Sequence, residues 1–366
     1  MILNKLSIIN YKNITQADLV FSPKINCFVG GNGEGKTNIL DAIYFLSLTK
    51  SATGTLDSLN IKHNETTMML SANYDVNGNE ENISGSIQIK QKKIFRRNQK
   101  AYKRLSEHIG LLPLVLVSPS DSILILGGSE ERRRFMDLVI SQYTPAYMEW
   151  LSHYNKALQQ RNALLKQDDS APSIEILDAY EQMMASYGEL IYHERDKYIR
   201  ELVPIFQKYY NRISGNRESV HLQYVSHGAR GPLYETIRAG RNRDLAIGYS
   251  LHGIHKDDLE MTLGGYNIRK EASQGQSKTY LISLKLAQLD FLEHTGSNTR
   301  PILLLDDIFD KLDSQRVKNI IDMVGKNDFG QIFITDTNRE HMDHILAHHA
   351  DDYKLFHVKS GNITPL

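Results

Sequence analysis

The chain has 366 residues, enough for two compact units, and its composition of 41% hydrophobic and 23% charged residues is typical of a soluble globular protein. Lysine plus arginine equals aspartate plus glutamate at 43 each, which argues against a nucleic-acid binder that acts through its overall charge. The chain has no apolar run of the roughly 20 residues that span a bilayer, no signal-peptide layout and a single cysteine, so we expect a cytoplasmic protein without an internal disulfide.

The first predicted unit of structure is a strand, a loop and a helix with a complete phosphate-binding motif. Residues 25–29 have the apolar character of a buried strand, and apolar residues recur at helical spacing over 39–46. Between them, residues 30–37 read GGNGEGKT, which matches the pattern G-x-x-x-x-G-K-[ST]. Such a loop directs backbone N–H groups and a helix N-terminus at phosphates. The residues expected to bind the nucleotide are Gly30, Gly31, Asn32, Gly33, Glu34, Gly35, Lys36, Thr37 and Asn38.

Residues 90–104 are strongly basic and predict a β-hairpin that turns at Asn98-Gln99. The segment carries lysine and arginine residues but no acidic residue, and aromatic residues lie among them. Such a stretch can neutralise DNA phosphates, although a solvated charged face explains the pattern equally well. The candidate DNA contacts are Lys92, Lys93, Arg96, Arg97, Lys100, Lys103 and Arg104.

Two shorter basic clusters follow along the chain. The first is Arg132–Arg134, and the second consists of Arg238, Arg241 and Arg243. On a helix, arginines of the first cluster could pair with the preceding glutamates instead of contacting DNA.

The middle of the chain predicts a helical arm. From about residue 128 the pattern turns helical, with apolar stripes over 151–158 and 177–202. We expect two antiparallel helices on either side of a break at 171–173, and an alternating strand pattern resumes near residue 246. The chain is therefore expected to form one α/β unit from residues 1–117 and 246–366, split by a helical arm at residues 118–245.

A second candidate anion-binding turn lies at Ser273-Gln274-Gly275-Gln276, directly before an amphipathic helix. It would present a hydroxyl, backbone N–H groups and the positive end of a helix dipole. Because the first loop already serves the nucleotide of its own chain, this turn makes most sense facing the nucleotide of another copy, through Ser273, Gly275 and Gln276. By itself the pattern favours a simpler reading, in which Ser273 caps the helix.

The segment 301–307 predicts an apolar strand that ends in two carboxylates. Beside a phosphate-binding loop this is the Walker B arrangement, in which Asp306 and Thr37 hold Mg²⁺. Asp307 is then placed to orient or deprotonate the attacking water, and Lys36 supplies a positive charge at the phosphates. Asp313 follows in a loop that either crosses to a second copy or caps the next helix, and the sequence leaves both open.

Together, the loop, the S-Q-G-Q turn, the Asp-Asp strand and the Leu-Asp pair after it resemble the ATPase heads of ABC and SMC proteins. More narrowly, the chain resembles the RecF family of bacterial DNA replication and repair proteins, almost from end to end. The other stretches that carry this resemblance are residues 6–13, 38–44, 131–137, 160–166, 253–259 and 356–363.

The resemblance implies an α/β fold, namely an ABC/SMC-type P-loop ATPase head with an inserted α-helical arm. It also implies ATP and Mg²⁺ as cofactors, with a weak ATPase activity that acts as a switch. ATP would drive two copies together head to tail, with Asp313 among the residues in trans, and close them on single- and double-stranded DNA near junctions. The implied partners are RecR- and RecO-type mediators, which help to load a recombinase in recombinational repair. The resemblance implies no association with a membrane.

Two alternatives share the P-loop. A nucleotide-binding subunit of a membrane transporter usually carries an L-S-G-G-Q signature and a switch histidine, whereas this chain has S-Q-G-Q and the sequence Thr335-Asp336-Thr337. The head of a full SMC or double-strand-break repair protein would carry a much longer arm.

Overall fold

The computed structural model describes every residue of the chain except 55, 167–171, 217, 296–298, 311, 326–328, 338 and 347–351. The chain divides into two units. Unit 1 comprises residues 1–122, 208–217 and 273–366, and unit 2 comprises residues 123–207 and 218–272.

This division differs from the expected one mainly at its second boundary. The first change of unit follows residue 122 rather than 117, but residues 246–272, which we expected in the head, lie in unit 2. The reason is that β10 (Asp258–Leu263) pairs antiparallel with β9 (Val220–Val225), from Asp258 opposite Val225 to Leu263 opposite Val220. An alternating pattern indicates a half-buried strand but does not say which strand it pairs with.

Unit 1 contains a six-stranded antiparallel sheet in the order β2-β1-β4-β5-β6-β7. Its short hairpin, β6 to β7, turns at Asn98 and Gln99 with φ angles of 49° and 69°, as a two-residue type I′ turn requires. The hairpin predicted around Asn98-Gln99 is therefore confirmed. The strands of this sheet are β1 (Ile2–Tyr11), β2 (Ile14–Val20), β4 (Thr67–Val76), β5 (Asn79–Gln88), β6 (Ile94–Arg97) and β7 (Lys100–Ala101).

A second six-stranded sheet of unit 1 has the order β15-β14-β3-β13-β12-β8 and is parallel apart from β15. Its strands β3, β12 and β13 are buried along their whole length, which explains why they are continuously apolar rather than alternating. Parallel strands end at the same edge of a sheet, so this sheet gathers the loops after β3, β12 and β13. The strands are β3 (Ile25–Val29), β8 (Leu114–Val117), β12 (Ile302–Asp306), β13 (Ile332–Asp336), β14 (Tyr353–Lys359) and β15 (Asn362–Pro365).

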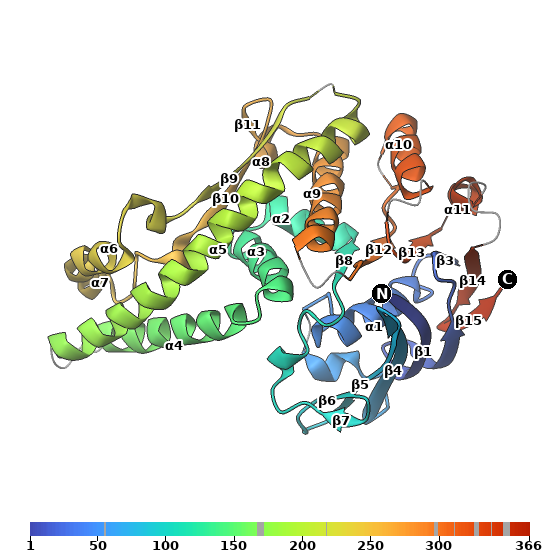
Figure 1. The fold of residues 1–366 in the computed structure, drawn as a ribbon, viewed down its shortest axis with the longest axis horizontal. Coiled ribbons are helices and arrows are strands. Elements are labelled where there is room, and N and C mark those ends of the chain that lie inside the picture. Colours follow the sequence, from blue (N-terminus) through green and yellow to red (C-terminus); the bar gives the residue numbers. More distant parts are fainter. Residues whose placement is uncertain are drawn as a thin grey trace. The chain divides into compact units, whose positions relative to one another are not determined.

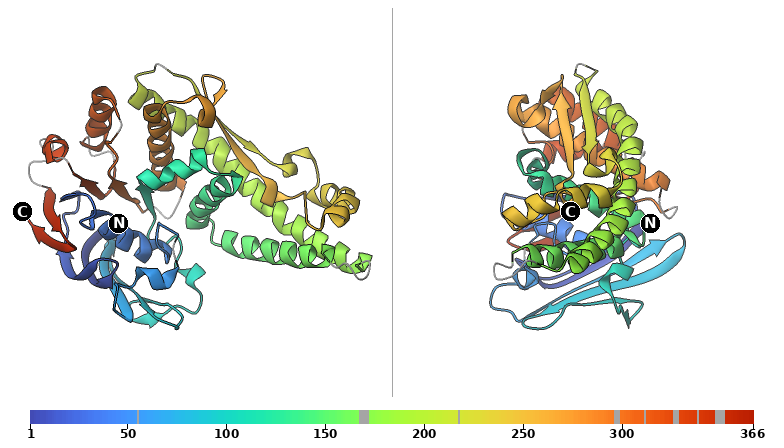
Figure 2. Two further views of the ribbon diagram at one scale, coloured as in Figure 1. Left: turned by 180° about the vertical axis from the view of Figure 1, so that it is seen from behind. Right: turned by 90° about the vertical axis from the view of Figure 1, so that its left-hand side faces the viewer.

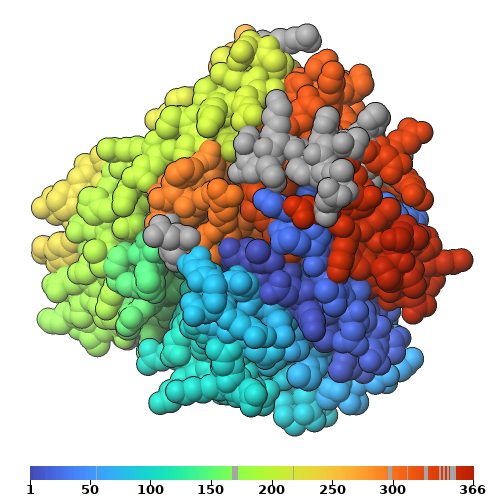
Figure 3. Space-filling view, turned by 45° about the vertical axis from the view of Figure 1, so that its right-hand side comes forward, coloured from blue at the N-terminus to red at the C-terminus, as the bar shows by residue number. Residues whose placement is uncertain are grey.

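Helix α1 (Lys36–Leu48) follows β3 and contacts strands of both sheets, and it is buried almost all round. Helix α9 (Gln274–Thr295) packs on β8. Unit 1 also contains α10 (Ser314–Gly325), α11 (Arg339–Leu346), η1 (Asp57–Asn60), η2 (Leu105–Glu107) and η3 (Pro119–Ser122). The C-terminal strands, in red, adjoin the blue N-terminal strands on the face that Figure 3 shows, in agreement with the pairing of β14 with β3.

Unit 2 is built on an antiparallel helix pair, α4 (Tyr147–Leu165) and α5 (Ile174–Ser214), which lie side by side in Figures 1 and 2. Arg161 contacts Glu181 and Tyr147 contacts Arg195, so ascending numbers on one helix meet descending numbers on the other. The predicted pair is confirmed, although residue 171 of the predicted break lies outside the described residues. The last turns of α5 belong to unit 1. Within the described ranges, no helix is both long and apolar enough to cross a membrane.

The remaining elements of unit 2 are short apart from α3. They are α2 (Ile123–Leu126), α3 (Ser129–Tyr143), η4 (His227–Arg230), α6 (Leu233–Ala239), α7 (Arg241–Ile247), η5 (Ile254–Lys256), β11 (Tyr266–Asn267) and α8 (Ile268–Glu271). Strands β11, β10 and β9 form a three-stranded sheet in that order.

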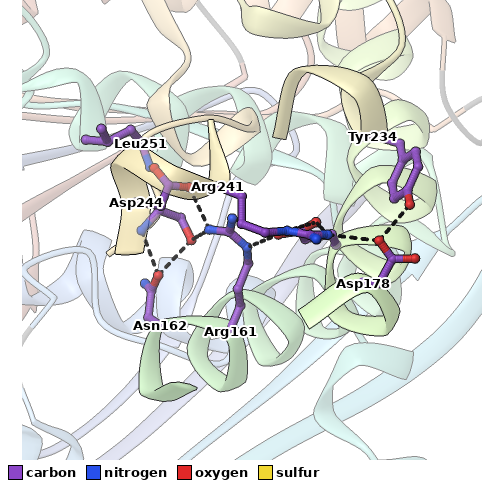
Figure 4. Close-up of polar contacts among 9 residues, drawn as sticks. Arg161, Asn162, Asp178, Tyr234, Arg241, Asp244 and Leu251 are labelled. Carbon is purple, nitrogen blue, oxygen red and sulfur yellow. Dashed lines mark hydrogen bonds and ion pairs between the residues drawn. The ribbon is translucent and has the colours of Figure 1, made fainter. Parts of the chain in front are cut away.

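A fully buried arginine joins α4, α5 and α7 (Figure 4). The guanidinium of Arg161 donates to Glu181 Oε1 at 2.9 and 3.1 Å and to Asp244 Oδ2 at 2.8 Å. Arg241 also pairs with Glu181 and donates to Asp178 at 2.9 Å. Because burying ions without partners is costly, a network with this many partners fixes how the three helices pack.

A second buried arginine, Arg195 of α5, organises the other part of unit 2. It pairs with Asp137 of α3 and with Asp257, each at 2.9 Å, and donates to the carbonyl oxygen of Ile254 at 3.0 Å. Burial raises the pKa of Asp257, while Arg195 and the hydroxyl of Tyr224 favour its charged form. Two of the stretches that resemble the RecF family, 131–137 and 253–259, therefore meet around Arg195, and a third, 160–166, contributes Arg161 to the first network.

Candidate nucleotide site

The phosphate-binding loop lies between β3 and the first residue of α1, as the sequence predicts. Gly33 and Gly35 have φ angles of 79° and 109°, which residues with a side chain rarely adopt. A Cβ atom on Gly35 would also lie 2.6 Å from the amide of Asn13, and one on Gly30 would clash with the carbonyl oxygen of Val358. The motif glycines are thus required by backbone geometry and by close packing.

An open pocket of about 190 Å³ lies beside this loop. Six of the nine expected loop residues line it, and Asp306, Asp307 and Thr335 complete it from the ends of β12 and β13. The lining residues from the loop are Asn32, Gly33, Gly35, Lys36, Thr37 and Asn38.

Lys36 is a buried cation whose partners are neutral. Its ammonium donates to the carbonyl oxygens of Gly30 and Gly31 at 2.8 and 2.7 Å. Burial lowers its pKa, which the nearby carboxylates of Asp307 and Asp306 oppose. Among the residues that the structure describes, no carboxylate lies within ion-pair distance of it. A phosphate group would supply the anion that the lysine lacks.

Thr37 and Asp306 meet at the floor of the pocket. The hydroxyl of Thr37 lies 2.9 and 3.0 Å from the two oxygens of Asp306, and Thr335 donates to Asp306 Oδ1 at 2.6 Å. Burial raises the pKa of Asp306, while the bonds from Thr335 and Thr37 lower it. A carboxylate and a hydroxyl fit Mg²⁺, which prefers oxygen ligands and keeps positions for waters and phosphate oxygens.

Asp307 adopts a strained backbone at the pocket edge. Its φ angle of 47° lies in the left-handed region, which is unfavourable for a non-glycine residue. Its N–H donates to the carbonyl and hydroxyl oxygens of Thr335, each at 3.2 Å. The strain turns the chain sharply after β12, so that Asp306 and Asp307 both line one pocket.

Glu34 does not line the pocket, and both its backbone and its carboxylate hold the loop in place. Its carbonyl oxygen accepts from Asn13 Nδ2 at 3.1 Å and from the N–H of Gly361 at 2.9 Å, and its carboxylate accepts from the N–H of Ser360. Asn13 also accepts a bond from Asn38 at 2.7 Å. Two turns far apart in the chain therefore brace the loop from outside the pocket.

The bracing by Asn13 and Ser360 and the role of Thr335 are absent from the sequence prediction. A usable signal existed for Thr335 alone, because it ends a buried strand that is parallel to the Asp-Asp strand. Turns that meet only through the tertiary fold leave no such pattern.

The Ser273-Gln274-Gly275-Gln276 turn caps α9. The N–H of Gln276 donates to Ser273 Oγ at 3.2 Å, and the N–H of Ser273 donates to Gln276 Oε1 at 2.8 Å, which is a reciprocal capping box. Asp313 caps α10 in a similar way, accepting from the N–H of Arg316 at 2.9 Å. The capping alternatives of the sequence analysis are therefore confirmed for both residues. Ser273 and Asp313 are exposed, so their role toward a second copy stays a prediction.

Comparison with known proteins places this geometry in a family. The family model described as RecF/RecN/SMC N terminal domain matches residues 2–363. The DNA replication and repair protein RecF of Phocaeicola vulgatus is 54% identical over 365 residues, which cover 100% of this chain and 98% of that protein. RecF of Porphyromonas gingivalis is 50% identical over 99% of this chain and 100% of its own length. This chain belongs to the RecF family.

Solved structures agree with this assignment. The recombination mediator protein RecF with ATP, from the RecFOR pathway, superimposes with a TM-score of 0.89 at 28% identity, covering 100% of this chain and 97% of that one. An Smc head bound to the C-winged helix domain of ScpA shares the fold, with a TM-score of 0.59 at 17% identity over 100% of this chain and 98% of that one. The predicted α/β fold with an ABC/SMC-type ATPase head is confirmed. End-to-end matches to RecF proteins decide against the transporter and full-length SMC alternatives.

Two cations of the basic hairpin in this RecF-family chain are paired with carboxylates within unit 1. Arg97 forms a two-pronged ion pair with Glu81, which raises the pKa of the arginine and lowers that of the glutamate. Lys93 donates to Asp57 at 3.2 Å and to the carbonyl oxygen of Thr49 at 2.7 Å. Of the other candidates, Arg96 is half-buried, and Lys92, Lys100, Lys103 and Arg104 are exposed.

The two other basic clusters contact carboxylates of unit 2. Arg134 pairs with Glu130 and Glu131 at 2.6 and 2.9 Å, as one alternative anticipated. Arg132 pairs with Asp258 at 2.6 Å. In the other cluster Arg241 pairs with Asp178 and Glu181, whereas Arg238 and Arg243 are exposed.

Proposed function

We propose that this chain is a cytoplasmic, ATP-dependent DNA-binding protein that acts in recombinational repair and the maintenance of replication forks. The observation that carries the proposal is the pocket in which Lys36, Thr37, Asp306 and Asp307 meet. Membership of a family of DNA replication and repair proteins, and the likeness to a RecF protein solved with ATP, support it.

Binding begins with the loop. The N–H groups at the start of α1 and the ammonium of Lys36 attract the phosphates, and Lys36 exchanges its carbonyl partners for phosphate oxygens. Thr37 and Asp306 would hold Mg²⁺, which would supply positive charge beside the phosphates. Asn13 and Glu34 hold the loop in its binding shape through the contacts described above.

Hydrolysis relies on Asp307, which we assign as the group that orients or deprotonates the attacking water. Because this carboxylate is half-buried at the pocket edge, it can reach water while Asp306 is occupied by the metal. We propose a weak ATPase whose hydrolysis resets a switch.

The switch is a head-to-tail homodimer. Ser273, Gly275, Gln276 and Asp313 of one copy would meet the nucleotide held by the other. In the capping box, Ser273 Oγ accepts a hydrogen bond, so its own hydroxyl hydrogen can be donated to a phosphate of the partner's nucleotide.

We base the proposed DNA-binding role on the distribution of charge in the chain. A chain with no net charge gains affinity for phosphates when two basic hairpins act on one DNA. We propose single- and double-stranded DNA, with junctions between them, as the target. RecR- and RecO-type mediators, with which the complex would load a recombinase, are the proposed partners, supported by the RecFOR pathway of the solved relatives.

A direct test measures DNA retention and particle mass together, with and without Mg-ATP, for wild type and Lys36→Ala. Wild type is expected to double in mass and to bind DNA more tightly with Mg-ATP, and the variant to do neither, because its loop loses the phosphate charge. ATP binding, dimer formation or DNA binding by Lys36→Ala equal to wild type would contradict the proposal.

A further inference from the structure

Lys278 connects the S-Q-G-Q turn to the loop after the Asp-Asp strand of the same chain. It lies within the first turns of α9, close behind Ser273–Gln276. Its ammonium donates to the carbonyl oxygen of Asp307 at 3.2 Å and to that of Asp310 at 2.7 Å. Charge-assisted bonds of this kind are stronger than those between neutral groups. One side chain of the turn-bearing helix thus fixes two backbone positions of the Asp307 loop.

The peptide groups on both sides of Asp307 are held. Thr335 of β13 accepts from its N–H, and Lys278 of α9 donates to its carbonyl oxygen. The left-handed backbone of Asp307 is unfavourable for a residue with a side chain and persists only when its surroundings impose it. Without Lys278, one of the two restraints on this conformation is lost.

A second link joins the far end of the same loop to α9. Arg316 pairs with Asp313 at 3.2 Å and donates to the hydroxyl of Thr279 at 3.1 Å. Thr279 follows Lys278 directly. The loop that begins at Asp307 and ends at Asp313 is therefore attached at both ends to the first turns of α9, although its residue 311 lies outside the described part.

We infer that Lys278 is a positioning residue that sets Asp307 for hydrolysis, and that it couples the Asp307 loop to the S-Q-G-Q turn of its own chain. This inference rests on the proposed roles of Asp307 and the turn. When the turn meets the partner's nucleotide, the effect of that contact passes along α9 and through Lys278 to Asp307 of the same chain. Occupancy of one site thereby tunes hydrolysis in the other.

The test compares Lys278→Met, which removes the charge at similar length, with Lys278→Arg, which keeps a cation and donors. Lys285→Met is the matched control, because Lys285 lies on the same helix and pairs with Asp121 at 2.8 Å, away from the loop. For Lys278→Met we expect kcat to fall roughly a hundredfold, with KM, nucleotide affinity and ATP-dependent dimer mass close to wild type. Lys278→Arg should recover most of kcat, and Lys285→Met should keep it.

Wild-type kcat in Lys278→Met, equal losses in the arginine and methionine variants, or loss of the dimer would overturn the inference. If Lys278→Met does not fold, Lys278→Gln, which keeps a donor without the charge, carries the same expectations.

A double variant separates this inference from the proposed function. Because Lys278 acts through Asp307, Lys278→Met should add almost nothing to the loss caused by Asp307→Asn. If instead it slows Asp307→Asn by its full factor, Lys278 acts elsewhere and the inference fails while the role of Asp307 stands. If Asp307→Asn alone hydrolyses ATP at the wild-type rate, the proposed role of Asp307 fails, and the inference fails with it.

Discussion

Lys36 in unit 1 and Arg161 in unit 2 are both buried cations, but their surroundings are opposite. Lys36 donates to two neutral carbonyl groups beside an open pocket. Arg161 is fully enclosed and pairs with the carboxylates of Glu181 and Asp244. The arm thus neutralises its buried charge within the protein, whereas the head keeps a positive charge for an anionic ligand.

The stretches of sequence that resemble the RecF family therefore serve two different purposes. The stretches that meet around Arg161 and Arg195 encode the packing of the arm, and the phosphate-binding loop and Asp-Asp strand encode a ligand site. Substitutions in the two regions should therefore affect different measurements, namely stability in the arm and nucleotide chemistry in the head.

The largest expected effect is on the stability of the arm. Arg161→Met leaves Asp244 buried without its cation and leaves Glu181 with Arg241 alone, so it should lower the free energy of unfolding by about 3–5 kcal/mol. Trp150, the single tryptophan, lies on α4 and reports arm unfolding by fluorescence in denaturant. Arg134→Met removes exposed ion pairs and should cost less than about 1 kcal/mol. Equal stability of the two variants would refute the claim that the buried ion pairs of Arg161 stabilise the arm more than the exposed pairs of Arg134.

Next in size is the effect of Asp307→Asn on the head. Hydrolysis should slow about a hundredfold, because the water loses its base, while affinity for Mg-ATP stays within about threefold since Asp306 and Thr37 remain. Asp310→Asn is the control, because it changes an exposed carboxylate of the same loop and keeps the carbonyl that binds Lys278. Steady-state rates and equilibrium nucleotide binding check both statements, and normal hydrolysis by Asp307→Asn would show that Asp307 is not the base.

A smaller effect concerns the pH dependence of the arm. Burial lowers the pKa of His255 to about 4, and the ring bonds the hydroxyl of Tyr154 and the carbonyl of Ser250. The unfolded chain takes up the proton near pH 6.5 and the folded arm only near pH 4, so stability present above pH 6.5 is lost as pH falls toward 4. We expect a loss of roughly 3 kcal/mol between pH 6.5 and pH 4.

His255→Gln should remove this contribution to the pH dependence, measured through Trp150 fluorescence in denaturant between pH 7 and 4. His221→Gln, at an exposed position of β9, should keep it. The same slope of stability against pH in both variants would show that another group is responsible.

The parts of the molecule that could be predicted from sequence are those that depend on local order. The loop at 30–37, the Asp-Asp strand, the hairpin at Asn98-Gln99 and the antiparallel helix pair all follow from motif, turn chemistry or periodicity. The partner of strand β10 could not be predicted, because its alternation fits any sheet with one covered face. This is why residues 246–272 were expected in the wrong unit.

The contacts that complete the nucleotide site are long-range and therefore escaped prediction. Thr335 reaches Asp306 across neighbouring strands, Ser360 braces Glu34, and Lys278 meets the carbonyl of Asp307. Each joins segments whose proximity depends on the whole fold. The candidate residues were found by residue type, but the atoms that position them needed the structure.

The most direct test of the central claim, that two copies share each ATP site, mixes two inactive variants. Ser273→Arg keeps its phosphate-binding loop but places a bulky cation in the turn, and Lys36→Ala keeps its turn but loses the loop charge. A mixed dimer has one complete site of two, so the ATPase rate of an equal mixture should recover to about a quarter of wild type with random pairing and to about half when only mixed dimers form. A mixture that shows only the sum of the two separate variants, over a wide range of protein concentration, would contradict the account.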